Sequence, residues 1–427
     1  MKMKDERTII LKKTKGFDPE TGNIIAAHII EKNKNIYMKK DKSRENILLE
    51  KNPDLFKLLM SVRRSDHQFP YRCYVLRTTY RCNSRCKYCF TRSPLPDEDI
   101  GVQDISDIAM KFKRKLFLLS GGEPTLRKDL PLIIQSIIKN KNTPILITNG
   151  IKLADYDYLL KLKNAGLQNI CLSFNGFSDD IYKKINGRPY LSIKLKALEN
   201  IKKAGLKIIL GYLVVKGINE KSKDFKKVFD YFLKNQDFVR EIDFRAAAPM
   251  GRYRKFNKIM MSEMLDVLSI SFKINKSDIM NEIKFVKYLD RYFNTNLLMP
   301  CRIDLFFKIR KNKLTPIIQD WELKKIEKSK FKRILLLFYS LKFFGVLTFA
   351  RLLIREISLF NYQEVFYWRS NVLKICFRLW PSKDTFDLGD LKNCQEAVVL
   401  NGHPIPRCYE LITDEFSHRP WKPLSSP

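Results

Sequence analysis

Residues 73–90 read CYVLRTTYRCNSRCKYCF and join a strand candidate, 73–80, directly to a loop with three cysteines. Cys82, Cys86 and Cys89 fall within eight positions, and the next cysteine along the chain is Cys171. Structural metal sites usually have four protein ligands, so three thiols predict a centre that keeps one coordination position open. The Cys-x3-Cys-x2-Cys spacing allows one loop to hold three corners of an iron–sulfur cube.

The strand at 73–80 is the first of six that alternate with helical segments between residues 70 and 280. The other strand candidates are 115–120, 143–149, 168–174, 206–215 and 241–248, and the helical segments are 103–112, 130–140, 156–166, 192–205, 223–235 and 261–272. This alternation predicts parallel strands joined by crossover helices. Six units are fewer than the eight of a closed barrel. We therefore expect an α/β fold, a partial (β/α)6 parallel barrel.

Sites in such folds lie at the carboxyl ends of the strands. The sequence SGGEPTL, Ser120–Leu126, follows the second strand. Gly121 and Gly122 allow a ligand to approach the backbone closely, and Glu123 adds an acceptor beside them. An ordinary strand-to-helix turn is the alternative interpretation. Asn-Gly pairs end the third and fourth strands, and these pairs also form turns without any ligand.

The cysteine loop, with Tyr88 before its last cysteine, and the Gly-Gly-Glu-Pro turn together resemble the signature of the radical S-adenosylmethionine (radical SAM) enzymes. The resemblance implies a [4Fe–4S] cluster on the three cysteines, with S-adenosylmethionine (SAM) bound to the open iron. It also implies reductive cleavage of SAM to a 5′-deoxyadenosyl radical that abstracts hydrogen. A small electron donor of the ferredoxin or flavodoxin type is the implied partner.

The resemblance also assigns further residues to the cofactor site. The turn Gly121-Gly122-Glu123 binds the amino group of the methionine part in the family. Polar residues at the ends of the third and fourth strands approach the carboxylate and the ribose, so we expect Ser173 and Asn175 on the ribose side. Two further cofactor-binding candidates are Asn149 and Arg245; Arg245 would pair with the carboxylate as a planar fork. A surface role is the alternative for Arg245.

The flanking regions resemble tetraether lipid synthase and the related class D radical methylases. Residues 14–41 keep a frame around Ile25, Ala27, Ile29, Glu31, Tyr37 and Met38, but every cysteine of that frame is missing. We interpret residues 1–69 as a degenerate amino-terminal module, 70–280 as the radical SAM partial barrel and 281–427 as a carboxy-terminal α/loop cap. The missing cysteine pairs put the specific synthase activity in doubt.

Three cysteines in the carboxy-terminal region are candidate ligands of a second, auxiliary iron–sulfur cluster. Cys301, Cys394 and Cys408 stand at positions that resemble those of the same relatives. Three ligands spread from residue 301 to residue 408 form a weak pattern. The alternative is that they are buried free thiols, which are common for cysteine.

The composition excludes several classes of protein. Hydrophobic residues make up 45% of the 427 residues, so the chain should fold rather than stay disordered. Nine unevenly spaced cysteines indicate a reducing cytoplasm rather than a disulfide scaffold. The formal charge of +34 fits an anionic partner, but the lysines spread along the whole chain, which favours compositional drift.

No secretory signal or membrane span is expected. The most apolar stretch, Ile334–Leu353, is interrupted by Lys342 and Arg351. It reads either as an interfacial helix that lies on a membrane or as a buried core helix. We therefore expect a cytoplasmic protein, with membrane association as an open alternative.

The leading functional interpretation is a radical SAM enzyme that functionalises an unactivated carbon of a lipid-like or other hydrophobic substrate. A peptide- or protein-modifying maturase is the first alternative. A tRNA-modifying enzyme rests on charge alone, so nucleic acid is not favoured as a partner. A cluster-carrying electron-transfer protein is the non-enzyme alternative, and it leaves the Gly-Gly-Glu-Pro turn without a purpose.

Overall fold

The computed structural model describes residues 71, 73–91, 93, 99–248, 251–253, 259–293, 298–299, 301–310, 313–344, 372–380, 394–400 and 403–407. Their strands form a single 12-stranded sheet in the order β12-β11-β1-β2-β3-β4-β5-β6-β10-β8-β7, with β9 paired to β8. The strands are β1 (Cys73–Thr79), β2 (Leu116–Gly121), β3 (Thr143–Thr148), β4 (Asn169–Ser173), β5 (Lys207–Val214), β6 (Val239–Ala246), β7 (Leu298–Met299), β8 (Arg302–Arg310), β9 (Lys313–Pro316), β10 (Val372–Leu379), β11 (Glu396–Leu400) and β12 (His403–Pro406).

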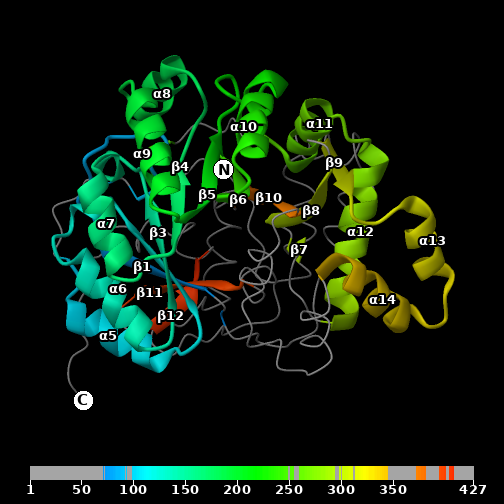
Figure 1. The fold of residues 1–427 in the computed structure, drawn as a ribbon, viewed down its shortest axis with the longest axis horizontal. Helices are drawn as coiled ribbons and strands as arrows, with labels where there is room; N and C mark the ends of the chain where they lie inside the picture. Colours follow the sequence, from blue (N-terminus) through cyan, green and yellow to red (C-terminus); the bar gives the residue numbers. More distant parts are fainter. Residues whose placement is uncertain are drawn as a thin grey trace, which may run out of the picture.

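Strands β1 to β6 are parallel neighbours in chain order, and crossover helices cover one face of the sheet (Figure 1). The α-helices are α5 (Val102–Lys111), α6 (Leu130–Lys139), α7 (Tyr156–Asn164), α8 (Asp179–Asn186), α9 (Leu191–Lys203), α10 (Ser222–Lys234), α11 (Met261–Phe272), α12 (Lys276–Phe293), α13 (Asp320–Lys328) and α14 (Lys332–Phe344). Two short 3-10 helices, η1 (Pro124–Leu126) and η2 (Lys152–Ala154), follow β2 and β3.

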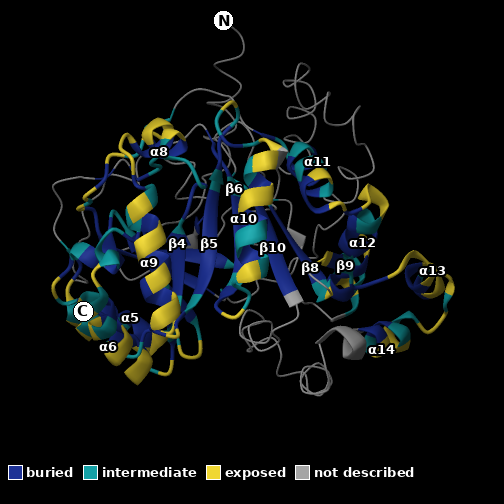
Figure 2. Ribbon diagram, turned by 45° about the horizontal axis from the view of Figure 1, so that its top comes forward, coloured by how far each residue is buried: buried dark blue, intermediate teal, exposed yellow. Residues whose placement is uncertain are grey.

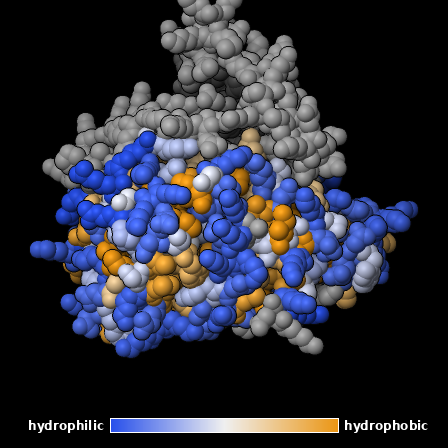
Figure 3. Space-filling model, turned by 90° about the horizontal axis from the view of Figure 1, so that it is seen from above, coloured by the Kyte–Doolittle hydropathy of each residue, from blue (hydrophilic) through white to orange (hydrophobic). Residues whose placement is uncertain are grey.

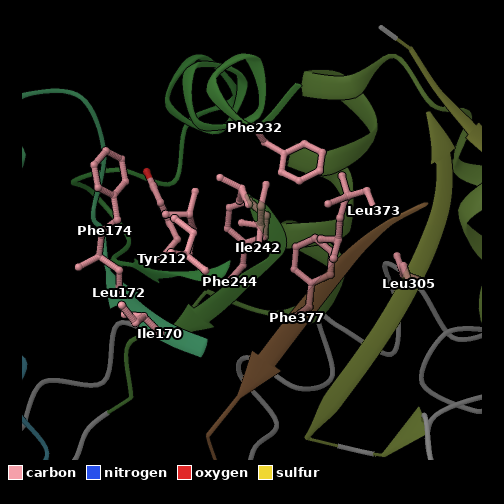
Figure 4. Packing of buried hydrophobic residues seen from close by; sticks show 14 of the residues in the cluster. Ile170, Leu172, Phe174, Tyr212, Phe232, Ile242, Phe244, Leu305, Leu373 and Phe377 are labelled. Carbon is pink, nitrogen blue, oxygen red and sulfur yellow. The ribbon is translucent and has the colours of Figure 1, made fainter. Parts of the chain in front are cut away.

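Helical spacing of apolar residues explains how the crossover helices pack. In α6, Leu130, Ile133, Ile134 and Ile137 are buried, and they repeat at the three- and four-residue intervals of one helix face. Figure 2 shows the result: the strands are buried, while the helices turn exposed faces outward. Figure 4 shows Phe232 beside Phe244 and Phe377, which belong to β6 and β10. From above, the described surface is mainly hydrophilic with separate hydrophobic patches (Figure 3).

The predicted (β/α)6 pattern is confirmed, with each of the six strands at its expected place. The carboxy-terminal region differs from the expected α/loop cap, because β8, β10, β11 and β12 extend both edges of the same sheet. In VLKICFRL, the sequence of β10, apolar residues alternate with Lys374, Cys376 and Arg378. Strands usually place polar residues toward solvent, but here the alternate positions are buried. The amino-terminal module, residues 1–69, lies outside the described residues.

Ion pairs join the two ends of the sheet. Glu396, the first residue of β11, accepts hydrogen bonds from Arg378 of β10 at 2.6 Å and from Arg407 at 2.5 Å. Arg302 of β8 lies 3.5 Å from the same carboxylate. Because β11 pairs with β1 at one end of the strand order and β10 and β8 lie at the other end, the sheet must curve. We call its concave side, opposite the crossover helices, the inner face.

Candidate functional site

The cysteine loop follows β1 at the carboxyl end of the sheet. Cys82, Cys86 and Cys89 are all partly exposed. Polar groups surround the sulfurs: Asn186 donates to Cys86 Sγ at 3.1 Å, and Thr91 Oγ1 lies 3.2 Å from Cys89 Sγ. Burial, with the nearby acidic groups of Glu123 and the other two cysteines, raises the pKa of Cys82 to about 12. A bound metal would reverse this effect, since coordinating thiols are deprotonated.

The Gly-Gly-Glu-Pro turn rests directly against this loop. The Gly122 N–H donates to the Thr79 carbonyl at 2.6 Å, and the Glu123 N–H donates to the Arg81 carbonyl at 2.8 Å. A Cβ at Gly121 would lie 2.1 Å from the Thr79 carbonyl oxygen, and one at Gly122 would lie 2.2 Å from that of Arg81. Only glycine fits at these two positions, which explains the motif physically.

The Glu123 carboxylate is buried and accepts four hydrogen bonds within the protein. Its Oε1 accepts from the N–H and hydroxyl of Thr125 at 3.1 and 2.6 Å and from the Thr148 hydroxyl at 2.7 Å. Its Oε2 accepts from the Asn149 N–H at 2.7 Å. Glu123 thus ties the turn after β2 to the end of β3. Its predicted contact with the methionine amino group stays a prediction.

The other polar candidates form a network around the loop. Asn149 donates to Asn83 Oδ1, within the cysteine loop, at 2.8 Å. Asn175 is buried and donates to Asn186 at 2.9 Å, and Asn186 in turn reaches Cys86. Ser173 lies partly exposed at the end of β4. The structure therefore brings the strand ends to the cysteines, with Asn175 behind the loop rather than open to a ligand.

Lys194 of α9 is a functional candidate that the sequence analysis missed. Its Nζ donates to the Ser173 carbonyl at 2.6 Å and also to the Asn149 carbonyl. Burial lowers its pKa to about 8, opposed by the negative charges of Cys86 and Glu123. A lysine within a helical segment gives no signal in the sequence, because only the fold turns it inward. Lys194 joins the ends of β3 and β4 and places a cation beside the site.

Residues after β6 bind the cysteine loop through hydrogen bonds to its backbone. Arg252 donates from its backbone N–H to the Cys89 carbonyl and from its guanidinium to the Cys86 carbonyl, both at 2.9 Å. Gly251 has φ +62, and a Cβ there would lie 2.2 Å from the Cys89 carbonyl oxygen. The sequence Met250-Gly-Arg after the sixth strand had no assigned role, so Gly251 and Arg252 are additional site residues.

Tyr88 lies beside an apolar cluster at the same end of the sheet. Its ring centroid is 4.5 Å from that of Tyr253. Ile181, Ile185, Val215 and Ala247 form the buried part of this cluster. The cluster offers an apolar surface next to the cysteine loop, which suits a flat aromatic group.

Two groups of predicted residues lie elsewhere. Arg245 is on the inner face of β6, where it pairs with Asp243 at 2.7 Å and donates to Cys171 Sγ at 3.1 Å. Cys301 and Cys394 are both partly buried; Cys301 precedes Arg302, and Cys394 lies two residues before Glu396. Cys408 lies outside the described residues, so the auxiliary cluster stays a prediction.

Comparison with known families agrees with this geometry. Residues 76–231 match the model of the radical SAM superfamily. This segment is a radical SAM domain. It contains the three cysteines, the Gly-Gly-Glu-Pro turn and Lys194. A radical SAM domain implies a [4Fe–4S] cluster and SAM, and the residues present fit both: three partly exposed thiols with polar side chains within hydrogen-bonding distance of two of them, and a glycine turn seated against their loop.

The radical SAM domain has relatives of several kinds. The 7,8-dihydro-6-hydroxymethylpterin dimethyltransferase of Methanocaldococcus jannaschii is 34% identical over 41% of this chain and 36% of its own length. The GTP 3′,8-cyclase of Helicobacter pylori J99 is 30% identical over 46% of this chain and 62% of its own length. The crystal structure of Streptococcus suis SuiB bound to S-adenosylmethionine has a TM-score of 0.42 at 15% identity, covering 57% of this chain and 56% of that one. The chain thus spans less than two thirds of these proteins.

Proposed function

We propose that the chain is a radical SAM enzyme that cleaves SAM reductively and abstracts hydrogen from an unactivated carbon of its substrate. The observation that carries the proposal is the seating of the Gly-Gly-Glu-Pro turn on the cysteine loop by backbone hydrogen bonds. When bound, the cluster and SAM supply one-electron cleavage to a 5′-deoxyadenosyl radical. The chain's own residues hold and orient these groups: Cys82, Cys86 and Cys89 bind the cluster, and the turn positions the methionine part.

The surrounding residues have supporting roles in this proposal. Lys194 places a positive charge at the ends of β3 and β4, where a carboxylate would be favoured. Tyr88 and its apolar neighbours supply a surface for the adenine, and Arg252 fixes the loop that carries the cysteines.

The test is SAM cleavage by anaerobically reconstituted, reduced protein. We expect 5′-deoxyadenosine and methionine in equal amounts, released slowly in the absence of substrate. A protein that assembles its cluster but cleaves no SAM would instead be a cluster-carrying electron-transfer protein, and the proposal would be wrong.

A lipid-like substrate is the finer proposal, together with membership of the tetraether lipid synthase and class D radical methylase group. The amino-terminal frame that supports the grouping lies outside the described residues. The support within the described residues comes from α14. Phe331, Ile334 and Phe338 are 70%, 63% and 62% exposed, while Leu336 and Tyr339 are buried in the core. No helix of the described residues is long and apolar enough to cross a membrane.

The exposed side of α14 has the features of an interfacial surface. Ile334 and Phe338 are four residues apart and share one side of α14, and Phe331 directly precedes the helix, three residues before Ile334. Around them, Lys328, Lys330 and Arg333 are exposed. Exposed apolar side chains with exposed cations close by in the chain match the interface of an anionic bilayer. We therefore propose that α14 rests on an anionic membrane surface.

The double variant Ile334→Ser/Phe338→Ser is expected to lose binding to phosphatidylglycerol vesicles and to keep its fold. Each large apolar side chain that enters the bilayer contributes about 1.5–3 kcal/mol, or roughly tenfold or more in affinity. Vesicle co-sedimentation measures the binding, and circular dichroism checks the fold. Leu336→Ser is the control for a core position and should destabilise the protein by about 2–5 kcal/mol, because Leu336 is buried. Equal binding by parent and double variant would contradict the membrane proposal.

A further inference from the structure

The inner face of β6, β10 and β8 carries charged side chains in register. The pairing of the strands aligns Arg245 with Arg378, and Arg378 with Arg302. Asp243, Cys376 and Asp304 form the next row on the inner face. In β6 this row lies two residues further from the carboxyl end of the strand. A row of three adjacent arginines thus lies toward the carboxyl end of β6, the side on which the cysteine loop lies.

Ion pairs neutralise most of these charges. Arg245 pairs with Asp243 at 2.7 Å, Arg302 with Asp304 at 2.9 Å and Lys374 with Glu241 at 3.0 Å. Glu396 holds both Arg378 and Arg407. Five cations face four carboxylates in this network, which leaves one positive charge uncompensated among the described residues. A buried charge without a partner is costly, so a site of this kind favours one further anion.

Arg245 is the member of the network that a ligand can reach. Its side chain is 23% exposed, whereas those of Arg302, Arg378 and Arg407 are 6–11% exposed. One of its nitrogens donates to Cys171, and burial raises the pKa of that thiol, so the acceptor is a neutral sulfur. A thiol is a weak acceptor. Nη1 of Arg245 has no hydrogen bond to any described residue, and it lies over Gly211, 3.5 Å from where a Cβ would be.

The neighbours of Arg245 on the inner face are also partly open. Leu213, the residue of β5 aligned with Arg245, is only partly buried, and so are Ser173, Ile147 and Leu118 on the next strands. These strands are covered by helices on their other face, so the exposure of these residues comes from the inner face. The guanidinium therefore borders solvent beside Ser173, at the end of β4 where the candidate cofactor site begins.

A metal site does not explain the same residues. Glu241, Asp243 and Cys376 have ligand atoms within 4.8 Å of one another. Lys374 and Arg245 already pair with the two carboxylates, so a cation there would be repelled. The excess charge of the network is positive, which favours an anion instead.

We propose that Arg245 anchors a phosphate or carboxylate group of the substrate on the inner face, next to the cofactor site. Calling that molecule the substrate rests on the proposed function, whereas the binding of an anion rests on the charge network alone. The proposal moves Arg245 from the cofactor carboxylate, its predicted partner, to the substrate. It also implies that the substrate has a polar, charged end.

Inorganic phosphate and pyrophosphate are the first probes. Isothermal titration calorimetry on the reconstituted holoprotein, at constant ionic strength in chloride, should show one site per chain. Arg245→Met should weaken pyrophosphate binding about ten- to hundredfold, since a charge-assisted hydrogen bond is lost. Arg240→Met is the matched control on the same strand: Arg240 alternates with the inner-face residues, so pyrophosphate affinity should not change. SAM affinity should be the same in all three proteins.

Two results would overturn the proposal. Unchanged pyrophosphate affinity in Arg245→Met would remove Arg245 from any anion site, and a selective loss of SAM affinity would return it to the cofactor carboxylate. If Arg245→Met fails to fold because Asp243 loses its partner, the double variant Asp243→Asn/Arg245→Met removes both charges of the pair and is read in the same way. Competition by GTP against glycerol 3-phosphate then separates a nucleotide from a lipid headgroup as the source of the phosphate. SAM cleavage by the parent protein, measured without substrate or pyrophosphate, tests the proposed function separately, because it does not depend on the anion-binding result.

Discussion

Replacement of Cys82, Cys86 and Cys89 together by Ala is expected to abolish SAM cleavage completely. The three thiols are the cysteines of one short loop; Asn186 donates a hydrogen bond to Cys86, and Thr91 shares one with Cys89. Without these ligands the cluster cannot assemble, and no other step can supply the electron to SAM. The measurements are iron content, the visible spectrum of the anaerobic protein and the release of 5′-deoxyadenosine.

Cys73→Ala is the matched control, because Cys73 is a buried thiol of β1 on the inner face and away from the loop. It should keep both the cluster and cleavage. Iron content and spectrum equal to the parent in the triple variant would refute the assignment of the loop. Partial loss of iron would indicate an auxiliary cluster, which a further Cys301→Ala/Cys394→Ala variant would then remove.

Glu396→Gln is expected to lower the free energy of unfolding by about 3–5 kcal/mol, because it leaves buried arginines without their counter-ion. Total stabilities are about 5–15 kcal/mol, so this single change removes a large share. Arg378, Arg407 and Arg302 surround the carboxylate. Although burial alone would raise it, these guanidiniums hold the pKa of Glu396 well below its usual range. Urea unfolding followed by circular dichroism measures the loss.

The pH dependence has a definite sign. Because the pKa of Glu396 is lower in the folded than in the unfolded protein, its contribution is present above the unfolded value of about 4.3 and is lost as the pH falls through the folded value. Glu199→Gln is the control, since the Lys196–Glu199 pair is exposed and should contribute about 0–1 kcal/mol. Equal destabilisation by the two variants would show that the ion pairs do not join the edges of the sheet.

The sequence was informative wherever a local rule determines the structure. Short β-rich runs that alternate with helical segments predicted β1 to β6 and the crossover helices between most of them, because both kinds of element are recognised from residues close together in the chain. The cysteine spacing predicted a cluster loop after the first strand, and the structure places the three thiols there. The two glycines of the turn were expected to let a ligand approach the backbone; in the structure they let the carbonyls of Thr79 and Arg81 approach it instead, and the ligand contact stays a prediction.

The sequence was misleading wherever burial depends on distant partners. Lys374, Cys376 and Arg378 make β10 look half exposed, but all three are buried. Their partners come from other strands, as with Glu241 of β6 for Lys374 and Glu396 of β11 for Arg378. Sequence analysis predicts that a charged side chain is exposed, because the residues near it in the chain do not show its counter-ion.

The candidate site also has a part that is set by nearby residues of the chain and a part that depends on distant ones. By itself the sequence determined the candidate groups: three thiols, a glycine turn and the strand ends that carry them, because these groups lie within short segments whose spacing is set by covalent geometry. Only the tertiary structure decided the surroundings. It placed Lys194 at the ends of β3 and β4, and it moved Arg245 to the inner face beside Asp243. These positions follow from helix packing and from strand register, which bring together residues that are far apart in the chain.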